Sequence, residues 1–187
     1  MSKIFIVSGP SGAGEDSVIE GLRNHFEIER VVTTTTRAMR PTESQGKPYY
    51  FITKEEFEEN INRDKMAEWA EEYNNNFYGV TREELERVAS SGCVGIWKIE
   101  YKGVITAKKK FPEIKSIYIA APSLEILRKR ILQRDSNLSQ EFLAERMEYT
   151  KEWIRHEGIY DYKVVNEEGK LDETVLKVAD IIRENLF

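Results

Sequence analysis

The feature that most constrains this chain is a short apolar run followed at once by a glycine-rich turn and an amphipathic segment. The run is Ile4–Val7, the turn reads GPSGAG, and apolar residues then recur at helical spacing from Val18 to Phe26. Such a strand, turn and helix start form an anion site, because backbone N–H groups converge there and the helix dipole adds positive potential. Glycine also lets the backbone wrap closely around an oxyanion. We therefore predict a phosphate-binding loop made of Gly9, Ser11, Gly12, Ala13, Gly14, Glu15, Asp16 and Ser17.

The loop departs from the usual nucleotide-binding pattern at one position. That pattern places lysine and then serine or threonine after the last glycine, whereas this chain has Glu15, Asp16 and Ser17. Two unit charges 4 Å apart interact by about 4 kcal/mol at an effective dielectric constant of 20, so an uncompensated Glu15 would oppose phosphate binding. Glu15 must therefore turn away, act through a metal ion or be neutralised by a nearby cation.

Strand-like and helix-like segments alternate along most of the chain. We expect strands at 30–36, 93–99, 116–121 and 162–166, and helices at 17–26, 81–92, 124–135, 141–158 and 171–186, with a helix or turn near 107–111. Thr81 is the expected N-cap of the second of these helices. The segment 37–79 differs, because it is polar, aromatic and turn-rich, with one expected helix at Lys54 to Asn62. The alternation predicts an α/β fold, a three-layer core with a parallel sheet between helices.

Length and composition exclude several classes of function. A chain of 187 residues suits one domain with small inserted lobes. A nucleic-acid binder is usually basic, whereas the net charge here is −5. One cysteine allows no internal disulfide framework, and two histidines give little support to a histidine metal site or a catalytic triad. No uncharged apolar run approaches the roughly 20 residues that span a bilayer, so we expect a cytoplasmic protein without membrane or nucleic-acid partners.

Several segments, in the same order along the chain, resemble the guanylate kinase family. TTTTRAMRPTESQGKPYYF at 33–51 resembles the family's nucleotide-monophosphate segment, and AEWAEEYNNNFYGV at 67–80 resembles its EWA…YYG stretch. LRKRILQRD at 127–135, followed by ERM at 145–147, resembles its arginine-bearing lid, and YDYKVVNEEG at 160–169 resembles its terminal strand. The resemblance covers nearly the whole chain.

The resemblance implies a binding site for GMP. Arg37 and Arg40 would hold the GMP phosphate, since guanidinium groups match phosphate oxygens as bidentate donors. Glu68 would accept hydrogen bonds from guanine N1–H and the exocyclic amine, an edge that adenine does not present. The other implied contacts with this nucleotide are Thr33, Tyr49, Tyr78, Thr81 and Glu100. The family commonly has a hydroxyl at the position of Val80, and Thr81 could replace it if Asn74–Asn76 shift the register by one residue.

The resemblance also implies a binding site for the phosphoryl donor. Arg130, Arg134 and Arg146 match arginines that the family directs at ATP phosphates and the transferring phosphoryl group. Asn166 matches a position near the adenine. Lys98 occupies a position where the family usually carries aspartate. Glutamate for lysine at residue 15 and lysine for aspartate at residue 98 suggest a charge exchange, in which Lys98 supplies the missing cation and Asp16 is the candidate ligand of Mg²⁺ through water.

The resemblance therefore implies ATP-dependent phosphorylation of GMP to GDP with Mg²⁺, by a monomer or homodimer. The implied division is a core of residues 1–32, 80–133 and 148–187, a GMP-binding lobe of 33–79, and a lid of 134–147. Two alternatives stay open at this point. Some guanylate-kinase-like domains without the loop lysine are protein-binding modules with weak or no catalysis. The Asp16–Ser17 pair also resembles the loop of ribose 1,5-bisphosphate phosphokinases.

Overall fold

A computed structural model describes residues 3–71, 75–135 and 138–186. Its larger sheet has five parallel strands, in the spatial order β2–β7–β1–β8–β9. The strands are β1 (Ile4–Ser8), β2 (Ile28–Arg30), β7 (Val94–Trp97), β8 (Lys115–Ala120) and β9 (Tyr162–Val165). The predicted parallel sheet is confirmed, and β1 lies at its centre, where the glycine-rich loop begins.

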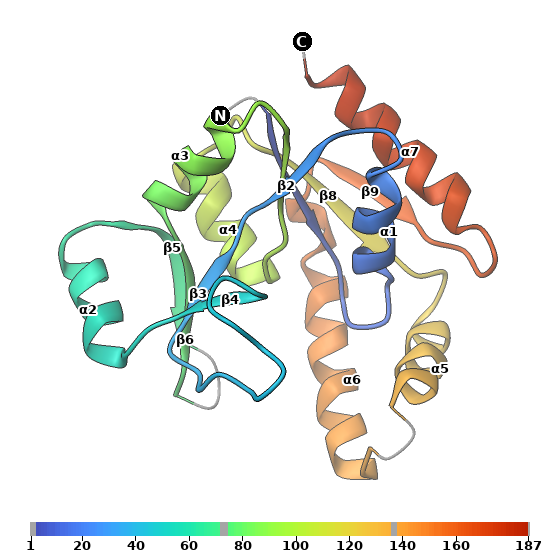
Figure 1. The fold of residues 1–187 in the computed structure, drawn as a ribbon. Helices are drawn as coiled ribbons and strands as arrows, with labels where there is room; N and C mark the ends of the chain where they lie inside the picture. The colour runs from blue at the N-terminus through green and yellow to red at the C-terminus, as the bar shows by residue number, and fades with distance from the viewer. Residues whose placement is uncertain (1–2, 72–74, 136–137, 187) are drawn as a thin grey trace.

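Helices cover both faces of this sheet (Figure 1). The helices of the chain are α1 (Glu15–Leu22), α2 (Lys54–Asn62), α3 (Arg82–Ser90), α4 (Tyr101–Lys110), α5 (Leu124–Arg134), α6 (Gln140–Arg155), the short 3-10 helix η1 (Glu157–Ile159) and α7 (Leu171–Glu184). Alternate residues of β1 enter two apolar clusters: Ile4 and Ile6 pack with α3, α4 and α6, and Phe5 and Val7 pack with α1, α5 and α7. This alternation is what a parallel strand buried on both faces requires.

A second sheet of four strands was not expected from the sequence. Its spatial order is β4–β3–β6–β5, with strands β3 (Thr33–Thr35), β4 (Tyr49–Phe51), β5 (Met66–Glu71) and β6 (Phe77–Thr81). The prediction of one strand over 30–36 is wrong, because Val31 and Val32 lead the chain from β2 in the larger sheet to β3 in the smaller one. Two of these strands have only three residues, too few to show a periodicity.

The second sheet has a small apolar core of its own. Phe57 of α2 packs with Met66 and Phe77, apart from the two clusters of the larger sheet. The sheet and α2 occupy one side of the molecule in Figure 1. We keep 33–79 as a proposed lobe, although β6 runs on to Thr81; residues 72–74 of that lobe and 136–137 of the proposed lid lie outside the described residues.

Local capping explains where several predicted helices begin. Thr81 Oγ1 accepts the backbone N–H of Glu84 at 3.1 Å, so Thr81 is the N-cap that the sequence predicted for α3. Ser123 caps α5 in the same way, and α2 has the predicted bounds. Among the described residues, the helices are all too short or too polar to cross a bilayer.

Candidate active site

The glycine-rich loop joins β1 to α1 with the backbone geometry that glycine permits. Gly12 and Gly14 have φ values of +87° and +92°, in the left-handed region that favours glycine. Gly9 lies so close to β8 that a Cβ there would approach the carbonyl oxygen of Ile119 to 2.4 Å. The loop therefore ends at the N-terminus of α1, where N–H groups and the helix dipole favour an anion.

Three side chains from the C-terminal half of the chain donate hydrogen bonds to this loop. Arg130 donates to the carbonyl oxygen of Gly12 at 3.3 Å and to that of Asn166 at 2.9 Å. Arg134 donates to Ser11 Oγ at 3.1 Å. The Asn166 amide donates to the carbonyl oxygen of Ala13 at 2.8 Å. Two of the predicted donor-site arginines are thus next to the loop, whereas Arg146 stacks on Phe142 of its own helix, 4.9 Å from the ring centroid.

The carboxylates of the loop meet two cations. Lys98 follows β7, and because β7 pairs in parallel with β1, its Nζ lies 3.4 Å from Glu15 Oε1 and 2.5 Å from Asp16 Oδ2. Arg30 at the end of β2 donates to Asp16 Oδ1 at 3.0 Å. Two carboxylates and two cations therefore balance at the start of α1. Sequence reasoning missed Arg30, because the expected strand began at this residue, whereas β2 ends there.

The pKa values of these two carboxyl groups are shifted in opposite directions. Desolvation raises the pKa of Glu15, and the charge of Lys98 only partly opposes it. For Asp16, desolvation acts in the same direction, but the hydrogen bonds and charges of Lys98 and Arg30 outweigh it and lower the pKa. Asp16 therefore gives up its proton more readily than Glu15, and both groups lie beside the ammonium of Lys98.

Arg37, two residues after β3, forms the centre of a second polar cluster. Its Nη2 donates to both carboxylate oxygens of Glu43, at 2.8 and 3.0 Å, and its guanidinium carbon lies 5.5 Å from the ring centroid of Tyr49. The rings of Tyr49 and Tyr78 pack edge to face, and the backbone N–H of Arg40 donates to Glu43 at 2.8 Å, while the Arg40 side chain is exposed. The structure therefore brings these four predicted residues together. Sequence reasoning missed Glu43.

Tyr49 connects the two clusters electrostatically. Desolvation raises the pKa of its hydroxyl, the Tyr78 hydroxyl adds to that effect, and the positive charges of Lys98 and Arg37 oppose it. Lys98 thus acts both on the carboxylates that follow the glycine-rich loop and on the hydroxyl of Tyr49. A cation in this position can compensate negative charge on either side.

Glu68 is a buried carboxyl group on β5. Only 4% of the residue is exposed, and a Cβ at Gly103 of α4 would lie 3.0 Å from its Oε2, so glycine there makes room for the carboxyl. Desolvation raises the pKa of Glu68 to about 8, and the charge of Lys110 opposes this only in part. A ligand with two hydrogen-bond donors could favour the ionised form of this buried acid, because both carboxylate oxygens would then accept a hydrogen bond.

The remaining predicted contacts lie around the same sheet and the start of α4. Thr33 pairs with Tyr49 between β3 and β4. Glu100 is the N-cap residue of α4, and its carboxylate accepts a hydrogen bond from Tyr149 of α6. Thr81 caps α3 through its hydroxyl oxygen. Asn74, on which the considered shift of register depends, lies outside the described residues.

The larger parallel sheet has a glycine-rich loop after its central strand, a smaller sheet is inserted beside it, and two arginines reach the loop. This combination defines a P-loop nucleoside monophosphate kinase. The class has several families. This chain belongs to the guanylate kinase family, since the family model described as guanylate kinase matches residues 1–185. It is thus a phosphotransferase of the kinase type.

Individual relatives agree with this assignment. The guanylate kinase of Haemophilus influenzae is 38% identical over 183 residues, 96% of this chain and 86% of that protein. The guanylate kinase of Lactococcus lactis is 39% identical over 181 residues, 95% of this chain and 86% of that protein. The crystal structure of guanylate kinase from Anaplasma phagocytophilum has a TM-score of 0.72 and 31% identity, covering 98% of this chain and 86% of that one.

Proposed function

We propose that this protein transfers the γ-phosphoryl group of ATP to GMP, forming GDP and ADP. The observation that carries the choice of acceptor is Glu68, a carboxyl group almost fully buried in the smaller sheet. Guanine presents N1–H and an exocyclic amine side by side, and one ionised carboxylate can accept from both. Adenine offers no such pair of donors, so a buried Glu68 selects guanine.

The cluster around Arg37 would hold the phosphate of GMP. Nη2 of Arg37 donates to both carboxylate oxygens of Glu43, and Nη1 donates to the carbonyl oxygen of Ala38. A phosphate has oxygens that could replace the Glu43 carboxylate as an acceptor. Tyr49 and Tyr78 would donate from their hydroxyls, with Arg40 as a second cation. We assign the remaining contacts with the guanosine part of GMP to Thr33, Thr81 and Glu100, as the family resemblance implies.

Lys98 would supply the cation that the loop lacks at residue 15. In the proposed transfer an oxygen of the GMP phosphate bonds to the γ-phosphorus of ATP as the bond to the β–γ bridging oxygen breaks. Charge shifts over the transferring group during this step, so positioned cations provide most of the catalysis. Lys98 is a candidate for that role because its ammonium acts on both polar clusters. Arg130, Arg134 and Arg146 would stabilise the donor phosphates, and Asn166 would lie near the adenine.

Mg²⁺ would accompany ATP at the start of α1. No group of three or more acidic, histidine or cysteine side chains among the described residues forms a cage for a metal. Mg²⁺ commonly needs no such cage, since it binds through one or two carboxylates together with waters and substrate phosphates. Asp16, with Ser17 beside it, fits that donor set, and its ion pairs with Lys98 and Arg30 favour a contact through water. When bound, Mg²⁺ would neutralise charge on the ATP phosphates.

A coupled assay tests the substrate assignment. The assay contains ATP and Mg²⁺ with GMP, dGMP, AMP, UMP or ribose 1,5-bisphosphate as the acceptor, and we expect turnover with the two guanine nucleotides. The comparisons favour this outcome over a binding module or a ribose bisphosphate kinase. Saturable GMP binding without turnover would instead support the binding module, and turnover of ribose 1,5-bisphosphate alone would support the second alternative.

Replacing Lys98 tests the proposed charge exchange. We expect Lys98→Ala to lower kcat by about 100-fold or more, comparable with the loss of one preorganised donor at a reacting centre. Lys102→Ala is the matched control, because Lys102 is an exposed lysine on α4, and it should keep the parent rate. If Lys98→Ala phosphorylates GMP as fast as the parent protein, Lys98 only forms an ion pair and the proposed role is wrong.

A further inference from the structure

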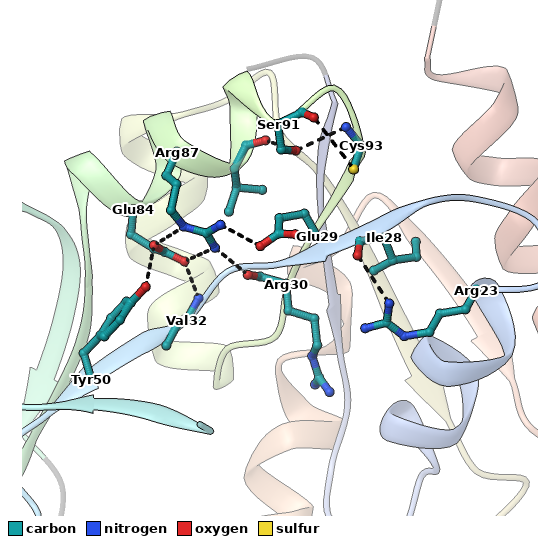
Figure 2. A network of polar contacts seen from close by, with 11 residues as sticks. Arg23, Ile28, Glu29, Arg30, Val32, Tyr50, Glu84, Arg87, Ser91 and Cys93 are labelled. Carbon is teal, nitrogen blue, oxygen red and sulfur yellow. Dashed lines mark hydrogen bonds and ion pairs between the residues drawn. The ribbon is translucent and has the colours of Figure 1, made fainter. Parts of the chain in front are cut away.

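Glu84 and Arg87 lie where the chain passes between the two sheets. The chain enters the smaller sheet at Val32, between β2 and β3, and leaves it after Thr81, where α3 begins. Glu84 is in the first turn of α3 and only 4% exposed, although it is a carboxylate. Figure 2 shows that its side chain points toward both the entering segment and the smaller sheet.

The Glu84 carboxylate contacts parts of the chain that are distant in sequence. Oε1 accepts the backbone N–H of Val32 at 2.8 Å, and Oε2 accepts the hydroxyl of Tyr50 in β4 at 3.4 Å. Arg87 pairs with both oxygens, at 2.8 and 2.9 Å. A buried carboxylate with this many partners is well satisfied, so the segments that it joins are held in a defined arrangement.

Arg87 extends the same network to the larger sheet. Its guanidinium donates to Glu29 at 2.6 Å and to the carbonyl oxygen of Arg30 at 3.2 Å, and both residues belong to β2 (Figure 2). Hydrogen bonds to Glu84, followed by those to Glu29, raise the pKa of the Arg87 guanidinium further above its ordinary value, so it stays charged. The ion pair between Glu84 and Arg87 therefore links three parts of the chain to the start of α3. They are β2 at the edge of the larger sheet, the segment that enters the smaller sheet, and β4.

We propose that Glu84, Arg87, Val32 and Tyr50 form a hinge clamp that orients the smaller sheet for GMP binding. Thr33 directly follows Val32, and Tyr49 directly precedes Tyr50, so the clamp is one residue away from two proposed GMP contacts. Of the four hydrogen bonds to the Glu84 carboxylate, the one from Tyr50 is the longest. It connects the side chain of Glu84 with a side chain of the smaller sheet. Glu84 is therefore a positioning residue, and Tyr50 is its side-chain contact in the smaller sheet.

The kinetic test of the clamp rests on the proposed function. Tyr50→Phe removes only the hydroxyl that reaches Glu84, and Tyr162→Phe is the matched control, since its hydroxyl pairs with Asn185 away from the smaller sheet. We expect Tyr50→Phe to raise the KM for GMP by roughly three- to tenfold, the effect of losing one hydrogen bond, with little change in kcat or in the KM for ATP. The control should match the parent protein in all three constants.

A second measurement needs no nucleotide and so separates the clamp from the proposed function. We expect Glu84→Ala to speed hydrogen exchange at the Val32 amide by about tenfold or more, because that amide loses its acceptor. If Glu84→Ala leaves hydrogen exchange at the Val32 amide unchanged, the clamp is wrong. It is also wrong if Tyr50→Phe leaves the KM for GMP unaltered, or raises it by the same factor as the KM for ATP. If the parent protein does not phosphorylate GMP, the proposed function fails and the exchange measurement alone decides the clamp.

Discussion

Glu68 makes a quantitative prediction about proton release. Its pKa of about 8 in the free protein means that roughly nine in ten molecules carry a proton on this residue at pH 7. Guanine offers two donors to the carboxyl, and only the ionised form accepts from both. GMP binding should therefore expel close to one proton per site at pH 7, and the number should fall toward zero as the pH passes 9.

The same reasoning sets the pH dependence of affinity. Ionising Glu68 before binding costs about 1.4 kcal/mol at pH 7, because each unit between pH and pKa corresponds to that amount. The Kd for GMP should therefore fall roughly tenfold from pH 6 to 7 and about fivefold from pH 7 to 8, with little change above pH 9. The GMP phosphate also titrates, with a second pKa of about 6, so the parent protein must be compared with a variant that binds the same ligand.

Calorimetry in two buffers of different ionisation enthalpy measures the released proton directly. Glu68→Gln is the comparison, because glutamine has nearly the same shape but cannot ionise. We expect the variant to bind GMP about 2–3 kcal/mol more weakly at pH 8, as for the loss of hydrogen bonds to a charged acceptor. Its proton release should be limited to that of the phosphate. Equal proton release by the two proteins would refute the assignment of Glu68 to guanine.

Stability without a ligand gives an independent check on the same residue. The folded-state pKa of Glu68, about 8, lies above its ordinary value of 4.5. The folded state therefore binds the proton more tightly than the unfolded state, so this contribution is complete below pH 4.5 and is lost as the pH rises through 8. Between these limits the free energy of unfolding should fall by up to about 1.4 kcal/mol per pH unit, and urea titrations of Glu68→Gln should lack that slope.

Two further substitutions test the phosphate contacts. Arg37→Lys should raise the KM for GMP by roughly ten- to 100-fold in the coupled assay, with no change in the KM for ATP, because lysine cannot form a bidentate pair with a phosphate. The control is Arg155→Lys, an exposed position where neither KM should change. If Arg37→Lys leaves the KM for GMP unaffected, the proposed phosphate contact is wrong. Gly14→Ala should destabilise the fold by about 1–2 kcal/mol in urea, since φ is +92° there and a Cβ would meet Asn166 at 2.5 Å. Gly158→Ala, where a Cβ meets nothing within 4 Å, is its control, and equal stabilities would contradict this explanation.

Local features of the sequence were enough to predict a parallel sheet, four of its five strands and most helices. The glycine-rich loop after Ile4–Val7 required a strand, a turn and a helix start, and all three are present. Thr81 and Ser123 capped helices where their hydroxyls could reach the first free N–H groups. The smaller sheet escaped prediction because β3 and β4 are short and owe their stability to pairing with strands that are distant in sequence.

The sequence by itself determined which chemical groups are available: a glycine-rich loop without its lysine, arginines and tyrosines in a family order, and a carboxyl at residue 68. Tertiary structure decided how these groups behave. Folding placed Lys98 beside Asp16, 82 residues away, and buried Glu68 so that its pKa rises to about 8. Burial and distance between charges set ionisation and pairing, and both arise from packing of segments that no local pattern connects.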